Sequence, residues 1–499
     1  MSLMNSLVRR YINKWDRELS DITQYPDQVQ QHQLQIISRS NIVRKMHPGL
    51  KDLSIQEYLN NRNLSSYDEY AVMVEELMSD DSIICRYYAQ SSGTTSGTKK
   101  LIPTPEEFVK CNHLRGSWYQ LHTLYRHDNE MSVFTQKNLL IGGSLYESNN
   151  RYTIGDVSGI MISRIPSFFR PWYVPSISEA IHHDWQTKLE TTASKAAKEK
   201  NIALLAGSPT WVLSTLRRVL SISQKNNLST LWPNLKAYIH GGVDFAPYRS
   251  QMDEITTGTN LRYIEVYNAS EGFFAYQDQP HSEGMLLMLA SGIYYEFIEE
   301  SAYRAGNMQF LNIKEVELGA NYVMVITTLS GLVRYVQGDI ITFVTKYPYR
   351  IKVISRIETY INAFGEDLLL SQAQEALSVT NASHQATISQ FHVAPYYLSL
   401  NTKGRHDWFI EWQKPPQGIE EYAQDLDHAL RKANPNYNQK RAGDIALENL
   451  RIHMLPQGTL NHYFMKFGSF TAQSKIQRMR NDRLIADRLT QLLSDRREL

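Results

Sequence analysis

Residues 201–209 read NIALLAGSP, an apolar run that stops at Gly207 and Ser208. Short apolar runs bounded by small or turn-forming residues are typical of buried strands. The segment that follows, PTWVLSTLRRVLSISQ at 209–224, has the apolar spacing of a helix. A strand that leads directly into a helix is the repeating unit of a parallel sheet, so this stretch predicts an α/β fold.

Three other apolar runs stop in the same way. They are LLIGGS at 139–144, LKAYIHGGVD at 235–244 and LRYIEVYNASEG at 261–272. Between the first and the second of these lies QTKLETTASKAAKEK at 186–200, which has helical character. Ligands of parallel sheets bind outside the carboxyl ends of the strands. We therefore expect the strand ends to face one crevice.

The composition limits the class of protein. A chain of 499 residues is longer than one hydrophobic core usually supports, which predicts at least two domains. Its 52 Lys and Arg against 51 Asp and Glu give no overall attraction to nucleic acid or to an anionic membrane. The two cysteines, Cys85 and Cys111, cannot form a disulfide framework and fit a reducing compartment. No apolar run approaches the roughly 20 residues that span a bilayer, so we expect a soluble, cytoplasmic protein.

A second pattern begins at residue 322. The segment YVMVITTLSGLVRYVQGDIITFV at 322–344 predicts two antiparallel strands joined by a turn at Ser330 and Gly331. Asp339 is expected at a turn between strands. An aspartate in a turn usually stabilises its own backbone, so a structural role for Asp339 stays open here.

The segment SSGTTSGTKK at 91–100 lies between two predicted strands, SIICRYYAQ at 82–90 and KLIP at 100–103. It is not a Walker A motif, because only three residues separate Gly93 from Gly97 and no Lys-Ser/Thr follows. One interpretation is a hairpin tip whose hydroxyls and backbone N–H groups bind an anion. The other is a solvated Ser/Gly turn, and this segment alone does not decide between them.

Three segments stand in a fixed order: SSGTTSGTKK, then YNASEGFFA at 267–275, then LVRYVQGDI at 332–340. In this order they resemble the GH3 acyl acid amido synthetases, which belong to the adenylate-forming superfamily. The segments AGSPTWV at 206–212 and HGGVDFAPY at 240–248 are also similar to the family, and the resemblance runs from about residue 80 to the C-terminus.

The resemblance implies a two-step reaction. ATP and a small-molecule carboxylic acid give an acyl-adenylate and pyrophosphate, and the amine of an amino acid then gives an amide and AMP. It also implies a phosphate loop that holds the β- and γ-phosphates, and whose residues are Ser91, Ser92, Gly93, Thr94 and Thr95. Glu271 matches the acidic residue that positions Mg²⁺.

Further positions of the nucleotide site follow from the same resemblance. Tyr267 and Ser270 flank the nucleotide, and Gly242 lies in one of the glycine-rich strand ends. Asp339 matches the carboxylate that binds both ribose hydroxyls, where a charged acceptor gives strong hydrogen bonds. Arg356 is in the position expected to approach ribose or phosphate.

Lys475 matches the Lys of a Q-x-K-x-x-R segment near the C-terminus, where a cation could meet the charge that develops on the carboxylate and the α-phosphate. Ser474 stands where the family has Tyr. An exposed Lys near Arg478 and Arg480 is also typical of a solvated face, so both interpretations remain.

A helix is predicted over 105–126, with Thr104 as its N-cap, and the resemblance implies that this helix borders the acyl pocket. Arg115 could pair with the substrate carboxylate, and Tyr119 and Phe273 would line the pocket. The alternative is that Tyr119 is a core residue and Arg115 a surface residue.

The resemblance divides the chain near residue 356. Residues 1–356 would form a large N-terminal ATP- and acyl-binding domain with β-sheets flanked by helices, and 357–499 a smaller α+β lid. In the lid we expect strands at 407–413 and 448–455 and a helix at 420–433.

Together these observations predict an ATP- and Mg²⁺-dependent enzyme that joins a carboxylic acid to an amino acid, with no nucleic-acid or membrane partner. An acid:thiol ligase of the same superfamily, or a non-catalytic nucleotide-binding protein, are the alternatives. The sequence does not predict the oligomeric state.

Overall fold

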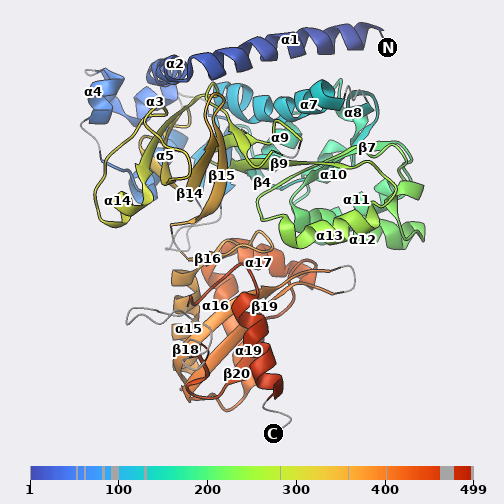
Figure 1. Ribbon diagram of the computed structural model, residues 1–499, viewed down its shortest axis with the longest axis vertical. Coiled ribbons are helices and arrows are strands. Elements are labelled where there is room, and N and C mark those ends of the chain that lie inside the picture. The colour runs from blue at the N-terminus through green and yellow to red at the C-terminus, as the bar shows by residue number, and fades with distance from the viewer. Residues whose placement is uncertain are drawn as a thin grey trace.

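The structure is a computed structural model. It describes residues 2–51, 54–60, 63–80, 85–91, 100–128, 132–280, 282–357, 359–399, 402–460, 463 and 477–495. Figure 1 confirms the α/β class: a large sheet-containing part lies above a smaller C-terminal part. Among the helices in these ranges, none is both long enough and apolar enough to cross a membrane.

One mixed sheet of 11 strands forms the centre of the larger part. In spatial order, its antiparallel half is β12 (Ile293–Glu299), β13 (Asn321–Thr328), β14 (Tyr335–Thr345), β15 (Arg350–Arg356), β11 (Met285–Leu287) and β10 (Gly272–Tyr276). Its parallel half continues with β9 (Arg262–Ala269), β8 (Ala237–Gly241), β7 (Ile202–Gly207), β3 (Lys137–Ile141) and β6 (Tyr173–Val174).

Helices cover both faces of the parallel half. Leu204 of β7 packs with Leu124 of α7 (Leu114–Asp128), whereas Leu205 packs in the core beneath α11 (Trp185–Ala196), α12 (Pro209–Ser223) and α13 (Ala246–Ile255). A strand buried on both faces needs apolar residues at successive positions, which explains the continuous run IALLA. The predicted neighbours are confirmed, because β3, β7, β8 and β9 lie side by side and run parallel.

The predicted antiparallel pair is also confirmed as β13 and β14, but the expected turn at Asp339 is wrong. Asp339 lies inside β14 and pairs with Arg356 of β15. The register between β13 and β14 shifts in this region, so β14 bulges there. Gly338 has a φ of 92°, which suits glycine and lets the strand continue through the bulge to Thr345.

The segment that carries the Ser/Gly loop forms a hairpin in a second sheet. β1 (Tyr87–Ser91) pairs with β2 (Lys100–Pro103) in antiparallel register, as predicted, and Ser91 lies opposite Lys100. The same sheet contains β5 (Thr153–Gly155) and β4 (Leu145–Ser148). Residues 92–99 lie outside the described residues.

The helix expected over 105–126 consists of three pieces. They are α6 (Glu106–Phe108), the π-helical turn η2 (Val109–His113) and α7. The predicted N-cap is wrong: Pro105 holds that position, and the Thr104 hydroxyl donates to the carbonyl of Ile102 instead. Thr104 still belongs to the extended segment, because its backbone N–H bonds to the carbonyl of Tyr87.

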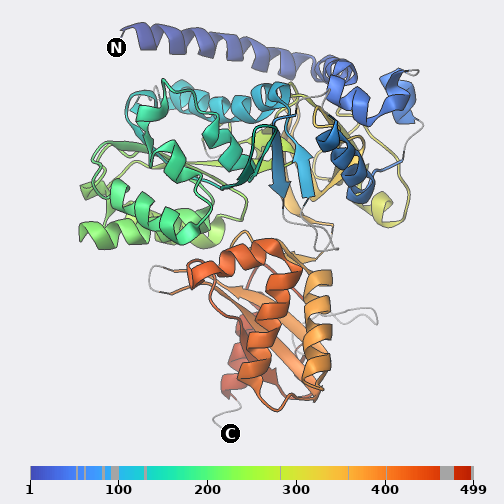
Figure 2. The ribbon, with the colours of Figure 1, turned by 180° about the vertical axis from the view of Figure 1, so that it is seen from behind.

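The N-terminal helices lie along one side of the molecule, and Figure 2 shows the long first helix from behind. They are α1 (Ser2–Gln24), α2 (Pro26–Arg39), α3 (Asn41–Met46), η1 (Pro48–Lys51), α4 (Ile55–Asn60) and α5 (Tyr67–Ser79). Helix α2 covers the outer edge of β12. Gln30 donates to the carbonyls of Leu289 and Ile293 and accepts from the backbone N–H of Tyr295, and Gln33 accepts from that of Gly292.

Short elements connect these layers. They are α8 (Ser132–Thr135), α9 (Val157–Ser163), η3 (Arg170–Trp172), α10 (Ile177–Ala180), η4 (Leu228–Thr230) and α14 (Glu300–Arg304).

The C-terminal part is built on a three-stranded sheet of β18 (Thr387–Tyr396), β19 (Arg405–Lys414) and β20 (Arg451–Leu455). Its other elements are β16 (Tyr360–Ile361), β17 (Leu368–Leu369), α15 (Leu370–Ser383), α16 (Ile419–Ala433), α17 (Pro435–Arg441), η5 (Ala442–Asp444) and α19 (Leu484–Asp495). The two predicted strands and the predicted helix are confirmed as β19, β20 and α16. The domain boundary at residue 356 stays a prediction.

One hydrophobic core joins the two parts. Trp211 of α12 and Tyr248 of α13 belong to the same cluster of buried side chains as Phe364 and Tyr437 of the C-terminal part. The C-terminal part is therefore packed against the parallel half of the large sheet.

Candidate functional site

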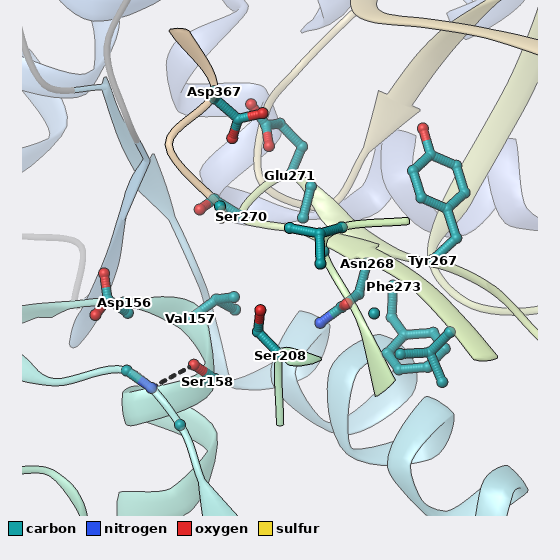
Figure 3. Close-up of a pocket in the computed structure, with 18 of the residues that line it drawn as sticks. Asp156, Val157, Ser158, Ser208, Tyr267, Asn268, Ser270, Glu271, Phe273 and Asp367 are labelled. Carbon is teal, nitrogen blue, oxygen red and sulfur yellow. Dashed lines mark hydrogen bonds between the residues drawn. The ribbon is translucent and has the colours of Figure 1, made fainter. Parts of the chain in front are cut away.

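A cavity of about 1520 Å³ lies at the carboxyl ends of the parallel strands. The strand ends that the sequence singled out all line it, as predicted: Gly142, Gly143, Gly207, Ser208, Gly241, Gly242, Ser270 and Glu271. Figure 3 shows Ser208, Ser270 and Glu271 around this space. The cavity also reaches β14, β15 and the start of the C-terminal part, because Asp339, Arg356 and Asp367 contribute to its wall.

Side chains from two other strands, Tyr267 of β9 and Arg356 of β15, meet Asp339 of β14. The Tyr267 hydroxyl donates to its Oδ2 at 2.5 Å, and Nε of Arg356 donates to its Oδ1 at 3.0 Å. Asp339 is only 6% exposed. Each carboxylate oxygen is held by one donor, and an oxygen of this kind can accept further hydrogen bonds from a ligand.

Burial and charge act on this cluster together. Burial raises the pKa of Tyr267 well above its usual range, and the charge of Asp339 adds to the shift, so the hydroxyl stays protonated and donates. Burial also opposes the charge of Arg356, but Asp367 and Asp339 outweigh it and raise the pKa of the guanidinium. Its second carboxylate, Asp367, lies 3.7 Å from the guanidinium. The Arg356 guanidinium therefore keeps its positive charge, whereas burial raises the pKa of the Asp367 carboxyl.

Glu271 lies in the two-residue turn between β9 and β10, next to Ser270. It is 6% exposed, and its carboxylate has no hydrogen-bond or ion-pair partner among the residues that the structure describes. Its charge acts on Tyr67, whose pKa is raised to about 12 mainly by burial. A buried carboxylate with no protein partner is the kind of group that binds a cation or a hydrogen-bond donor of a ligand.

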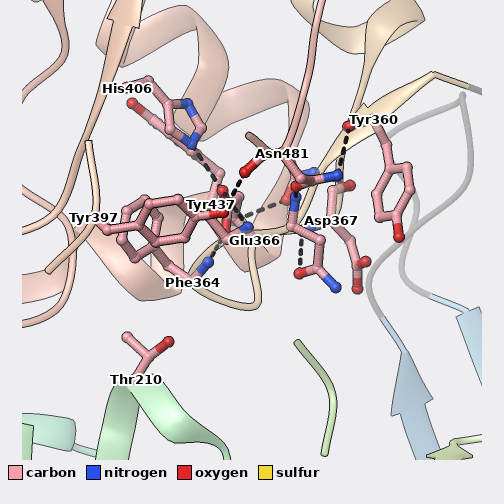
Figure 4. A network of polar contacts seen from close by, with 12 residues as sticks. Thr210, Tyr360, Phe364, Glu366, Asp367, Tyr397, His406, Tyr437 and Asn481 are labelled. Carbon is pink, nitrogen blue, oxygen red and sulfur yellow. Dashed lines mark hydrogen bonds and ion pairs between the residues drawn. The ribbon is translucent and has the colours of Figure 1, made fainter. Parts of the chain in front are cut away.

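The turn at 362–367 brings the C-terminal part to the cavity. The Glu366 carboxylate accepts from the backbone N–H groups of Ala363 and Phe364 and from Nε2 of His406, and Figure 4 shows this network. The side-chain amide of Asn362 donates to the carbonyl of Gly242 at 2.9 Å. The turn thus connects a strand end of the large sheet with Asp367.

The residues expected at the acyl pocket do not all lie there. Phe273 lines the cavity, but Arg115 and Tyr119 do not. Arg115 pairs with Glu18 of α1 at 2.8 Å, and the Tyr119 hydroxyl donates to the same carboxylate at 2.9 Å. Successive helical residues are about 100° apart, so Arg115 and Tyr119 lie on a different face of α7 from the residues that line the cavity. The face toward the cavity carries Leu114, Ser117, Trp118 and Leu121.

Two groups of candidate residues lie outside the described residues. They are the phosphate-loop positions Ser92, Gly93, Thr94 and Thr95, and Lys475. Ser91 ends β1, and its neighbour in that strand, Gln90, lines the cavity. The loop therefore begins beside the cavity.

Family models match three stretches of the chain. They are the GH3 family N-terminal domain at 16–192, the GH3 family central domain at 286–356 and the GH3 family C-terminal domain at 371–484. Together the matches cover more than half of the chain and follow the order of the family. The chain belongs to the GH3 family.

Relatives of this GH3 protein include two from Arabidopsis thaliana. Indole-3-acetic acid-amido synthetase GH3.4 is 23% identical over 79% of this chain and 65% of its own length. Indole-3-acetic acid-amido synthetase GH3.3 is 25% identical over 50% of this chain and 44% of its own length. The chain thus spans less than two thirds of the length of either relative.

Two solved structures share the fold of this GH3 protein. The structure of AtGH3.15 acyl acid amido synthetase in complex with 2,4-DB has a TM-score of 0.58 and 17% identity and covers 95% of both chains. A 2-hydroxyisobutyryl-CoA ligase in the thioesterification state has a TM-score of 0.53 and 13% identity, over 97% of this chain and 93% of its own.

The sequence of this GH3 protein did not point to two charged residues of the cavity. Asp367 lies in the turn at 362–367, and Lys440 lies on α17, 73 positions later along the chain (440 − 367). Neither is part of a motif. Only the packing of the C-terminal part onto the large sheet brings them to the site.

Proposed function

We propose that this GH3 protein is an ATP-dependent acyl acid amido synthetase. It would convert a carboxylic acid and ATP into an acyl-adenylate and pyrophosphate, and then transfer the acyl group to an amino acid, with release of AMP. The observation that carries the proposal is that Tyr267, Glu271, Asp339 and Arg356 line one cavity. The family resemblance assigns these four residues to the nucleotide site.

The chemistry explains why such a site needs fixed charges. A carboxylate is a poor electrophile, and attachment of AMP turns one of its oxygens into a good leaving group. Asp339 would accept hydrogen bonds from both ribose hydroxyls, because Tyr267 and Arg356 hold its two oxygens in place. Charge stabilisation by groups already in position is usually a large part of catalysis.

Glu271 would hold Mg²⁺. Mg²⁺ commonly takes one or two protein carboxylates and completes its octahedron with phosphate oxygens and water. The buried Glu271 carboxylate fits this need, whereas the described residues contain no group of three or more His, Cys, Asp and Glu side chains that could hold a metal alone. Bound there, Mg²⁺ would neutralise charge on the phosphates. Ser91, Ser92, Gly93, Thr94, Thr95 and Lys475 remain proposed phosphate and carboxylate contacts.

The acid would be an aryl or a medium-length aliphatic one. The face of α7 toward the cavity carries Leu114, Trp118 and Leu121, and the ring of Phe169 lies 6.0 Å from that of Trp118. Pockets of this composition bind apolar groups and use a few polar atoms for orientation. We place the protein in the cytoplasm, with small molecules as its partners.

The test is pyrophosphate release from ATP and Mg²⁺ over a panel of carboxylic acids, each with and without pooled amino acids. Acid-dependent release that accelerates with amino acids, with AMP and an amide detected by mass spectrometry, would support the proposal. Release that accelerates only with coenzyme A would identify a thiol ligase. Absence of both release and ATP binding would refute an adenylating enzyme.

A further inference from the structure

A buried lysine lies in the cavity where α12 meets the C-terminal part. Lys440 of α17 lines the cavity there and is only 8% exposed. Its ammonium lies 4.7 Å from the centre of the Trp211 ring, which stacks at 3.9 Å on Trp185. Burying a charged ammonium is costly unless a partner compensates it.

The contact with the Trp211 ring does not neutralise the charge of this ammonium. Within the described ranges, Lys440 makes no hydrogen bond and no ion pair. Burial lowers its pKa to about 8, while Asp156, Glu366 and Asp367 act on it from beyond ion-pair distance and favour the charged form. Glu366 is already engaged by His406 and two backbone N–H groups. Lys440 is thus a buried cation that faces open space.

The N-terminus of α12 adds to the positive charge. This helix has 15 residues, with Ser208 as its N-cap and Pro209 in the first turn. The first N–H groups of a helix have no partner within the helix, and the helix dipole makes this end positive. The Ser208 hydroxyl is buried, forms no cap hydrogen bond and has no partner among the described residues. Thr210 of the same turn lies across from the Phe364–Asp367 turn in Figure 4.

A carboxylate lies on the same cavity as this cationic region. Asp156 accepts from the backbone N–H of Ser144 and from the Tyr146 hydroxyl, both through Oδ2 at 2.8 Å. Its Oδ1 makes no hydrogen bond with any residue that the structure describes. Figure 3 shows Asp156 and Ser208 on the same space. The region therefore offers a cation and a helix N-terminus for an anion, and one free carboxylate oxygen for an N–H donor.

We propose that this region binds the amine acceptor, and that the acceptor is an α-amino acid whose carboxylate lies between the Lys440 ammonium and the N-terminus of α12. The amine would donate to Oδ1 of Asp156. The proposal rests on the proposed amido synthetase function and deepens it. The proposed nucleotide site uses Asp339 on β14 and Glu271 in the β9–β10 turn, so the nucleotide does not account for the Lys440 cation on α17.

The test compares two acceptors in three proteins: the wild type, a variant and a control variant. The acceptors are an amino acid that the wild type conjugates and the carboxamide of the same amino acid, which lacks the charged carboxylate. The variant is Lys440→Met, and the matched control is Lys432→Met, an exposed lysine on α16. Loss of one charge-assisted contact typically weakens binding about 10-fold to 100-fold.

We expect Lys440→Met to raise the KM for the amino acid by about this factor while the KM for the carboxamide changes little. The KM for ATP and for the acid, measured by pyrophosphate release, should stay as in the wild type. Lys432→Met should behave as the wild type with both acceptors. If Lys440→Met still prefers the amino acid over its carboxamide by the wild-type ratio, the proposed carboxylate site is wrong.

A second variant keeps the test valid if Lys440→Met does not fold. Lys440→Arg keeps the positive charge, so it should keep the preference for the carboxylate form, and loss of that preference would contradict the proposal. The outcomes also separate the two proposals. A wild type that forms no amide with any acid refutes the amido synthetase function, whereas a wild type that forms amides without any preference for the carboxylate form refutes only the acceptor site.

Discussion

Replacement of Asp339 tests the nucleotide site most directly. Asp339→Asn keeps the shape of the side chain but removes its charge and replaces one acceptor oxygen with an amide group. Hydrogen bonds to a charged group contribute about 1.5–3 kcal/mol each, so the loss of one ribose contact and the weakening of the other should cost about 2 kcal/mol. This corresponds to a roughly 30-fold higher KM for ATP.

The assay is acid-dependent ATP–pyrophosphate exchange over a range of ATP concentrations. Tyr267→Phe is the matched control, because it removes only the hydroxyl that holds Oδ2 of Asp339 and should raise the KM for ATP by a smaller factor, roughly 3-fold. Thermal unfolding of both variants shows whether the folded state is intact. An unchanged KM for ATP in folded Asp339→Asn would refute a role for Asp339 in nucleotide binding.

Three further changes test other parts of the molecule. Glu271→Gln should raise the Mg²⁺ concentration for half-maximal exchange at least about 10-fold, and a normal Mg²⁺ titration would remove Glu271 from the metal site. Trp118→Ala should raise the KM for the acid while that for ATP is unchanged; equal changes in both would show that Trp118 does not line the acyl pocket. Arg334→Leu should lower the free energy of unfolding by about 3–5 kcal/mol in chemical denaturation, because it leaves Glu296 buried without its bidentate partner. A double variant that also replaces Glu296 with Leu should lose less, and an equal loss would contradict this explanation.

The strand ends could be predicted from the sequence because they depend on local chemistry. A run such as IALLA followed by Gly207 and Ser208 specifies a buried strand and its end without knowledge of the rest of the chain. Asp339 was placed on the right segment but in the wrong local structure. A bulge at Gly338 lets the strand continue. The dipeptide Gly-Asp is compatible with a turn and with a bulge, so its sequence does not distinguish the two.

The rest of the site depends on contacts between distant segments. The position of Arg115 depends on α1, which packs against α7 and brings Glu18 to pair with Arg115. Lys440 and Asp367 carry no motif, and their position follows from the packing of the C-terminal part on α12. Contacts between segments so far apart in the chain leave no local pattern in the sequence.

The cover of β12 by helix α2 has a consequence for the protein in a crowded solution. An uncovered edge strand presents a row of free N–H and C=O groups on which another chain can extend the sheet. On β12 the Gln30 amide bonds to the carbonyl of Ile293 and to the N–H of Tyr295, and the backbone of Leu311 bonds to Phe297. None of these groups carries a net charge. This protection against edge-to-edge pairing with another chain is therefore insensitive to pH and to salt, unlike protection by a lysine on the edge strand.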